Sequence, residues 1–239
     1  MRLRASFARA AALLWAGPTL ALPVEVYFQW GSGPTQNATY DSTQLGEIDN
    51  GDGTFTYDGS AAAGGGGWNL SWDVTVKEDP FIDGIIAVTN NTAFTQTYTV
   101  IFTSPVSPAI TPSSLSGASV IGNLTVNGGG GTLGHNAGAA MFTALLDGVP
   151  YDTLLPFDSS VTLAFGSGST GADSFGLPGL TQPGPAVLTS MGIQLTFTLT
   201  PGDSASFTSR FEVVPVPEPL SALLVGGGLI AFGVLARRR

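Results

Sequence analysis

The sequence contains no cysteine, a single histidine and few charged residues. Without cysteine, disulfides, thiol catalysis and thiolate-bound metals are excluded within it. His135 alone cannot build a metal site of several histidines, and any Ser–His–Asp set would have to use it. Strong helix formers are scarce because charged residues make up only 10% of the chain. With 43% hydrophobic residues the chain can still form a core, and we expect few helices.

Basic residues are nearly confined to the two ends. Between residues 22 and 219 only Lys77 and Arg210 occur, against 17 acidic residues, which gives this segment a formal charge of −15. A body this acidic would be repelled by phosphate backbones, which argues against a nucleic acid partner. We interpret most of the acidic side chains as a solubilising surface.

Residues 1–21 have the pattern of a secretory signal peptide. Three arginines are followed by a short apolar run and then by small residues. Thr19-Leu20-Ala21 puts small residues at the positions that signal peptidase reads, so we expect export through the secretion translocon and cleavage after Ala21. A buried N-terminal helix is disfavoured because Pro18 interrupts the run.

A second apolar run, Leu220–Ala236, holds 17 residues without a charge. As a helix it would be about 25 Å long, near the lower limit for crossing a bilayer. Arg237, Arg238 and Arg239 follow directly, and positive residues beside a span remain in the cytoplasm. The sequence therefore predicts a single transmembrane helix with the acidic body outside.

Val216, Pro217, Glu218 and Pro219 stand immediately before this run. The two prolines favour an extended peptide, which suits binding in the cleft of a processing enzyme. A Pro-Glu-Pro motif, a short apolar span and an arginine cluster, in this order, resemble the PEP-CTERM sorting signal of exosortase-processed bacterial proteins. The resemblance covers residues 216–239.

This resemblance implies a Gram-negative bacterium that makes extracellular polysaccharide. It implies that an integral-membrane exosortase cleaves near Pro217-Glu218-Pro219, so that these residues are a substrate. The protein would be anchored transiently in the inner membrane with its body in the periplasm, and then reach the cell surface or the extracellular matrix. The alternative is an ordinary single-span anchor with a proline-stiffened stalk.

Residues 22–214 show apolar and polar residues in alternation, which is typical of strands with one buried face. The clearest apolar series are Trp68, Leu70, Trp72, Val74 and Val76, then Phe94, Gln96, Tyr98, Val100 and Phe102, and finally Ile193, Leu195, Phe197 and Leu199. Dipeptides such as Asp147-Gly148 predict tight turns between them. The pattern predicts an all-β domain, an antiparallel β-sandwich.

Several segments leave local alternatives open. Ala137–Leu146 could form a helix, but we favour a strand. The glycine tracts Gly64–Gly67 and Gly128–Gly131 predict flexible loops. Val88–Thr92 and Thr200–Ser206 resemble stretches of other PEP-CTERM bodies, a similarity that implies no activity.

Residues with chemical potential are few. His135 lies between glycines without a Gly-x-Ser-x-Gly motif, so we interpret it as a loop histidine. Asp49–Thr54 is spaced loosely like a calcium loop but lacks the closing glutamate, which favours a hairpin turn. Trp68 and Trp72 share one strand face and could stack on sugars, although core packing is the commoner use. We predict no catalytic residue, no metal site and no cofactor.

We therefore expect a non-enzymatic, exported surface or matrix protein with exosortase as its processing partner. The alternative is a carbohydrate-binding or adhesive module on the same frame, calcium-assisted or not, with exopolysaccharide as its partner. A secreted hydrolase is a third and remote reading.

Overall fold

The computed structural model describes residues 24–31, 35–41, 43–77 and 80–216. The predicted signal peptide, the Pro217-Glu218-Pro219 motif, the run 220–236 and the three terminal arginines lie outside the described residues. Within these ranges the chain forms strands and turns and no helix, so the predicted all-β class is confirmed. No helix of the described part is long and apolar enough to cross a membrane.

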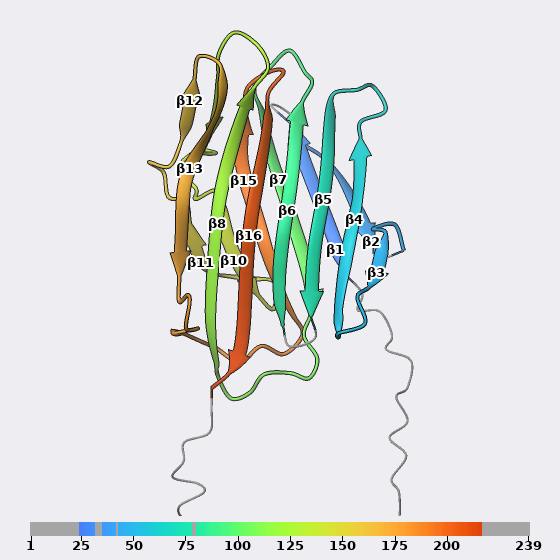
Figure 1. Cartoon of the computed structure of the whole chain (residues 1–239), viewed down its shortest axis with the longest axis vertical. Helices are drawn as coiled ribbons and strands as arrows, with labels where there is room; N and C mark the ends of the chain where they lie inside the picture. The colour runs from blue at the N-terminus through green and yellow to red at the C-terminus, as the bar shows by residue number, and fades with distance from the viewer. Residues whose placement is uncertain (1–23, 32–34, 42, 78–79, 217–239) are drawn as a thin grey trace, which may run out of the picture.

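The strands form two antiparallel sheets that face each other in a sandwich-like arrangement (Figure 1). The first sheet has the order β11-β10-β15-β7-β1-β2, with β9 and β12 attached. Its strands are β1 (Glu25–Gly31), β2 (Gln36–Asp41), β7 (Gln96–Pro105), β9 (Gly131–Gly134), β10 (Phe142–Leu146), β11 (Val149–Leu154), β12 (Val161–Leu163) and β15 (Ser190–Leu199). The second sheet has the order β13-β8-β16-β6-β5-β4-β3, with β14 beside β8. Its strands are β3 (Glu47–Asp49), β4 (Thr54–Ala62), β5 (Trp68–Lys77), β6 (Phe81–Asn90), β8 (Ser114–Val126), β13 (Gly166–Phe175), β14 (Gln182–Gly184) and β16 (Ser204–Pro215).

The core lies between the sheets and follows the period-2 pattern of the sequence. In β5 every second side chain is buried, from Trp68 to Val76. Aromatic rings join the sheets: Phe28 of β1 meets Trp68 of β5 edge-on at 4.6 Å between ring centres, and Phe197 of β15 lies 4.8 Å from Phe207 of β16. Such pairs add to the free energy gained by burying apolar area.

Three local expectations were only partly right. Phe94 is 70% exposed because the strand predicted to include it begins at Gln96. Ala137–Leu146 is not a helix, and only its second half, β10, is a strand. Gly131 begins β9 instead of lying in a loop, and a Cβ atom there would come within 2.2 Å of the Asp203 carboxylate.

The sandwich has two distinct ends. At one end, which we call the tail end, lie Val24 and Val216, the first and last described residues (Figure 1). The strand registers agree with this placement. Glu25, next to Val24, pairs with Thr103 near the end of β7, and Pro215, next to Val216, pairs with Ser114 at the start of β8. The opposite end, the far end, carries the β4–β5, β6–β7 and β15–β16 connections.

Candidate functional site

His135 does not take part in a Ser–His–Asp arrangement within the described part of the chain. Its Nδ1 lies 2.9 Å from the carbonyl oxygen of Ala139, and because a carbonyl only accepts, Nδ1 carries the proton. Its ring lies 5.6 Å from that of Phe157, and Nε2 is buried without a hydrogen-bond partner. The imidazole therefore packs against a loop and an aromatic ring.

Residues 49–54 form the predicted hairpin turn. β3 and β4 are antiparallel neighbours, and the pair nearest the turn is Asp49 with Phe55. Asp49 Oδ1 accepts the amide of Gly51 at 2.8 Å, and Asp52 Oδ1 accepts both the amide and the hydroxyl of Thr54. These carboxylates thus close the turn, and no group of three or more potential metal ligands gathers in the described residues.

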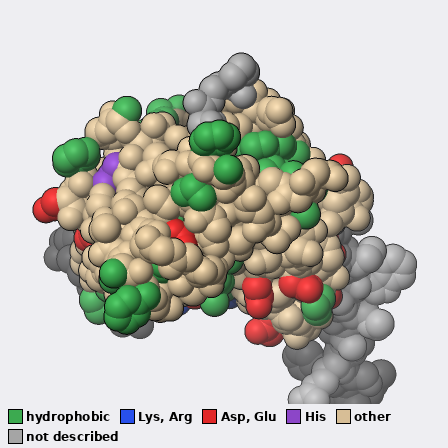
Figure 2. All heavy atoms as spheres, turned by 90° about the horizontal axis from the view of Figure 1, so that it is seen from above, with side chains coloured by type: hydrophobic (Ala, Val, Ile, Leu, Met, Phe, Trp, Pro, Cys, Tyr) green, Lys and Arg blue, Asp and Glu red, His purple; other side chains and the backbone are tan. Residues whose placement is uncertain are grey.

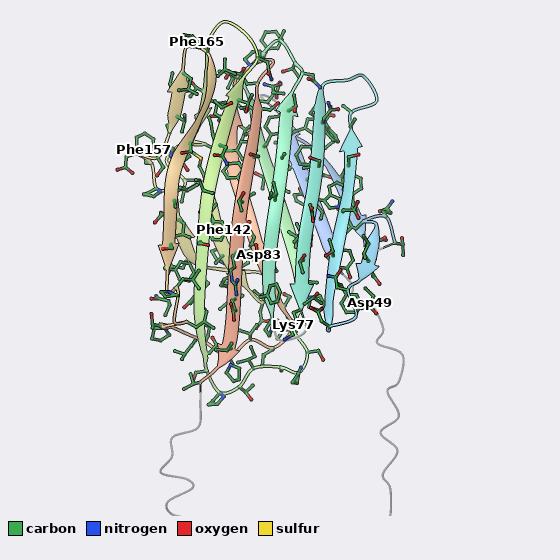
Figure 3. All side chains as sticks on the ribbon, in the orientation of Figure 1. Asp49, Lys77, Asp83, Phe142, Phe157 and Phe165 are labelled. Atoms are coloured by element: carbon green, nitrogen blue, oxygen red, sulfur yellow. The ribbon has the colours of Figure 1, made fainter. Side chains whose placement is uncertain are left out.

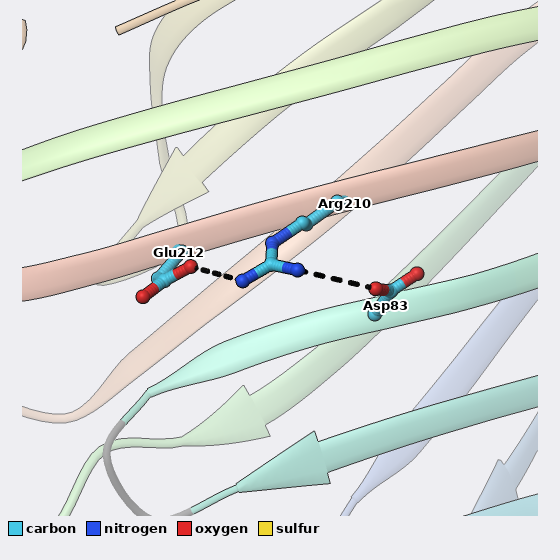
Figure 4. Close-up of polar contacts among 3 residues, drawn as sticks. All are labelled: Asp83, Arg210 and Glu212. Carbon is cyan, nitrogen blue, oxygen red and sulfur yellow. Dashed lines mark hydrogen bonds and ion pairs between the residues drawn. The ribbon is translucent and has the colours of Figure 1, made fainter. Parts of the chain in front are cut away.

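Arg210, on the outer face of the second sheet, is held by two acidic neighbours (Figure 4). Its Nη2 lies 2.5 Å from Glu212 and its Nη1 lies 3.7 Å from Asp83 on the neighbouring strand. The guanidinium also covers the ring of Phe81 at 5.7 Å. Such a partly exposed ion pair contributes little to stability.

Trp68 and Trp72 are both core residues, as the commoner reading predicted. Their exposed fractions are 3% and 4%, so they cannot form an exposed sugar-stacking row. The two indoles differ in their N–H groups, however. Trp72 donates to the carbonyl of Leu45 at 3.4 Å, whereas the N–H of Trp68 is buried and has no partner.

A pocket of about 470 Å³ opens beside Trp68 at the far end, between the edges of the two sheets. The residues that line it with functional side chains are Trp30, Gln36, Trp68, Thr92, Gln96 and Tyr98. None of the described residues lining it carries a charge. Its volume lies in the range of about 300–1,000 Å³ that is typical of small-molecule sites.

One wall of this pocket is a single row across the first sheet. Trp30 pairs with Gln36 of β2 on one side and with Tyr98 of β7 on the other, and Tyr98 pairs in turn with Phe197. Residues that pair across neighbouring strands point to the same face. The row therefore places an amide, an indole and a phenol side by side, from exposed Gln36 through partly buried Trp30 to fully buried Tyr98.

The hydroxyl of Tyr98 is buried and has no hydrogen-bond partner, like the N–H of Trp68. Burial raises the pKa of the Tyr98 phenol above its ordinary value, so the group keeps its proton and remains a donor. Leaving a buried polar group unpaired costs about 1–3 kcal/mol. Trp68 and Tyr98 both belong to the lining of the pocket, but their unpaired polar atoms are themselves closed to solvent.

A hydrogen-bond network holds the loop that carries Thr92 at the rim of the pocket. Asn90 is fully buried; its amide donates to the carbonyls of Phe94 and Leu199, and its Oδ1 accepts from both the amide and the hydroxyl of Thr92. The backbone of Asn90 also exchanges bonds with Gly202 and Asp203. We call Asn90, Thr92, Thr200, Gly202 and Asp203 the far-end network.

Asp203 ties this network to the β8–β9 connection. Its carboxylate is fully buried and accepts from the amide of Asn127 at 3.1 Å and from the hydroxyl of Thr200. The stretches Val88–Thr92 and Thr200–Ser206 therefore meet at this network.

Sequence reasoning missed Trp30, Gln36, Gln96 and Tyr98 as site residues. One signal was available: Gln96 occupies an inward-facing position of an otherwise apolar series, where a polar side chain needs a partner. The pairing that brings Gln36 and Trp30 beside Tyr98 involves strands far apart in the sequence, and periodicity alone does not reveal it.

Exposed aromatic residues elsewhere do not form a comparable site. Phe157 and Phe165 are 71% and 82% exposed, and both project from the loops around β12 and β13 (Figure 3). No protein-family model matches the chain, and no curated protein is significantly similar to it.

Proposed function

We propose that the protein is an exported, non-enzymatic surface or extracellular-matrix protein that a C-terminal PEP-CTERM signal delivers to exosortase. The observation that carries the proposal is the ordered series of Pro217-Glu218-Pro219, the uncharged run 220–236 and the arginines 237–239. Each part has a separate physical role: an extended cleavage peptide, a membrane span and a cytoplasmic stop.

The end of the folded body supports this proposal. β16 ends at Pro215, and Val216 is 39% exposed, with its amide bonded to Ser113 at 3.3 Å. The motif therefore begins directly after the last strand, with Val216 as its only described residue. A processing enzyme needs a peptide whose backbone groups are free, since a strand inside a sheet has them occupied.

The test replaces Pro217, Glu218 and Pro219 together by alanine in the exporting host. We expect the variant to remain in the inner membrane with an intact tail, whereas mass spectrometry of the wild-type protein finds a C-terminus near residue 217. The matched control, Pro156→Ala with Asp158→Ala, removes an exposed proline and an acid from another loop and should be processed normally.

A host strain without exosortase separates sorting from ordinary anchoring. The wild-type protein should be retained in that strain and released in the parent strain. If the tail stays intact in both strains, the chain is an ordinary single-span membrane protein, and the sorting proposal is wrong.

A further inference from the structure

We propose that one half of the tail end docks on the lipid surface of the membrane while the tail is intact, with exposed apolar side chains entering the headgroup region. This inference rests on one part of the proposed function, the membrane span formed by residues 220–236. Docking keeps the Pro217-Glu218-Pro219 motif at the surface of the membrane in which the processing enzyme lies.

Three connections at the tail end are joined into one surface by hydrogen bonds. Ile110, in the β7–β8 connection, and Val187, before β15, exchange backbone bonds of 2.8 and 2.9 Å. The carboxylate of Asp147, in the β10–β11 turn, accepts the amide of Leu188 at 3.0 Å. We call this surface the apolar half of the tail end; it consists of residues 106–113, 147–149, 185–189 and Val216.

Apolar side chains of this surface project into solvent. Val149 is 63% exposed, Leu188 57% and Val216 39%. The only charged side chain in the surface is that of Asp147, whereas residues 22–219 together carry a formal charge of −15. Exposed apolar side chains that gather where charge is missing indicate contact with another apolar phase. Smaller exposed residues extend the surface between them: Pro108, Ala109, Pro112 and Pro185.

The place where the described chain ends identifies that phase. Val216 belongs to the surface, since its amide donates to the carbonyl of Ser113 at 3.3 Å. Only residues 217–219 separate it from Leu220, the first residue of the uncharged run. A chain covers at most about 3.6 Å per residue, so Val216 lies within about 14 Å of the span. The headgroup region on one side of a bilayer is roughly 5–8 Å thick, and so short a tether keeps the surface beside it.

The charge on the rest of the tail end sets the orientation. The β3–β4 turn lies toward the same end, since Thr54 pairs with Lys77, and Asp49 and Lys77 lie low in the view of Figure 3. Asp49 and Asp52 of this turn are exposed. Carboxylates lose hydration in a membrane surface and are repelled by anionic headgroups. A body tethered at Val216 therefore turns its apolar half to the lipid and this turn to the water.

Lipid fits this surface better than a second copy of the chain does. A stable interface between two proteins buries about 1,200 Å² or more, and the large side chains that project here are few. Lipid contact needs less area, because the tether already holds the body at the membrane and makes the contact intramolecular in effect.

The test labels single cysteines, which the cysteine-free sequence makes specific. Leu188→Cys carries a nitrobenzoxadiazole fluorophore. The full-length chain, with its tail kept intact in a host without exosortase, is placed in phosphatidylcholine vesicles that contain a lipid spin-labelled on its acyl chain. We expect emission at a shorter wavelength, and quenching about 3-fold or more stronger than for the same probe at Phe165→Cys.

Phe165 is a suitable control position because it is 82% exposed and lies at the far end (Figure 3). The next residue, Gly166, pairs with the last residue of β8, a strand of 13 residues that is about 43 Å long. The far end has apolar side chains of its own (Figure 2), so a probe there shows whether exposure alone produces the signal.

A second probe, at Ala109→Cys, tests the side chains that make the contact. Val149→Ser together with Leu188→Ser should reduce its quenching about 2-fold, because less apolar area meets the lipid. Phe157→Ser together with Phe165→Ser is the matched control and should leave the quenching unchanged. Both pairs are exposed, so the melting temperature should stay close to that of the wild type. Adding phosphatidylglycerol should not strengthen the quenching, since the contact is apolar and the body is acidic.

Extraction with alkaline carbonate separates the span from the docking. If carbonate extracts the full-length chain, residues 220–236 do not cross the membrane, and both the span and the docking are wrong. If the chain resists carbonate but the Leu188 probe behaves like the Phe165 probe, the docking alone is wrong. A wavelength shift without quenching by lipid would mean that a second copy covers the surface, and quenching that requires phosphatidylglycerol would mean an electrostatic contact. Either result would overturn the proposal.

Discussion

At the tail end the hydroxyl of Tyr151 donates to the carbonyl of Pro183 at 2.8 Å and accepts from the hydroxyl of Ser116 at 3.0 Å. At the far end the hydroxyl of Tyr98 is buried with no partner. Both tyrosines belong to the first sheet, so the difference lies in their surroundings. The Tyr151 hydroxyl is thus paired in the folded protein, whereas the Tyr98 hydroxyl is left unpaired.

Two aspartates show a different contrast between the ends, in burial. Asp147, in the β10–β11 turn at the tail end, accepts from the amides of Leu188, Thr189 and Ser190 and is partly exposed. Asp203, at the far end, is fully buried and joins three connections through the far-end network. The carboxylate of Asp203 therefore joins turns inside the folded body, whereas that of Asp147 closes a turn near the surface.

The largest effect is expected for Asn90→Ala. Removing this side chain takes the partner from the buried carbonyl of Leu199 and from the Thr92 amide and hydroxyl, so the free energy of unfolding should fall by about 3 kcal/mol or more. Urea unfolding followed by tryptophan fluorescence measures it. Its exposed neighbour offers the control, since Asn91→Ala should change stability by less than about 0.5 kcal/mol. Equal effects would mean that the network does not hold the far end.

A close approach at the same end gives the second prediction. Gly131→Ala would place a methyl group against the Asp203 carboxylate and should cost about 2 kcal/mol in the same unfolding experiment. Gly128→Ala, in the same glycine tract, meets nothing within 4 Å and should be nearly neutral. If both substitutions are neutral, the tract is a simple loop, as sequence reasoning expected.

The two tyrosines give the third prediction, which compares the ends directly. Tyr151→Phe removes a hydroxyl with two hydrogen bonds and should lower the free energy of unfolding by about 1 kcal/mol. Tyr98→Phe should leave it unchanged or raise it, since its hydroxyl is buried without a partner. Thermal unfolding of the two variants measures both effects. A loss of equal size in both would show that the ends do not differ.

The smallest expected effect concerns how the stability contributed by Asp147 changes with pH. Partial burial acts to raise the pKa of Asp147, but hydrogen bonds from three backbone amides and the Thr189 hydroxyl outweigh it and lower the pKa below its ordinary 3.8. Because the folded-state pKa is depressed, the stabilisation is complete above the ordinary pKa and is lost as the pH falls through the lower folded value. Asp147→Asn should therefore cost less than about 1 kcal/mol at pH 7, and this deficit should shrink below about pH 4. A deficit that grows on acidification would contradict the assignment.

Much of the body was predictable from local patterns. Trp68, Leu70 and Trp72 were expected in the core because they occupy alternate positions of one strand, and all three are buried. The Asp147-Gly148 pair predicted a tight turn, and both residues do adopt positive φ angles, of 50° and 74°. Such features depend on neighbours in the sequence, and local sterics decide them.

The candidate site could not be predicted in this way. Tyr98 and Gln96 were assigned to an apolar strand face, but the sequence does not say that Trp30 and Gln36 pair beside them or that Trp68 faces them from the other sheet. The proposed sorting motif has the opposite character, because it consists of neighbouring residues and rests on the sequence alone.

The sequence by itself thus determined the strand-forming alternation, the turns, the acidic surface and the residue order of the tail. Only the tertiary structure decided that Asn90 meets Asp203 and that Trp30, Trp68 and Tyr98 surround one pocket. The physical reason is that alternation sets which face a side chain points to. Its neighbours on that face come from strands that can lie more than a hundred residues away, as Ser204 and Thr89 do, and the order and register of those strands depend on the packing of the whole sandwich.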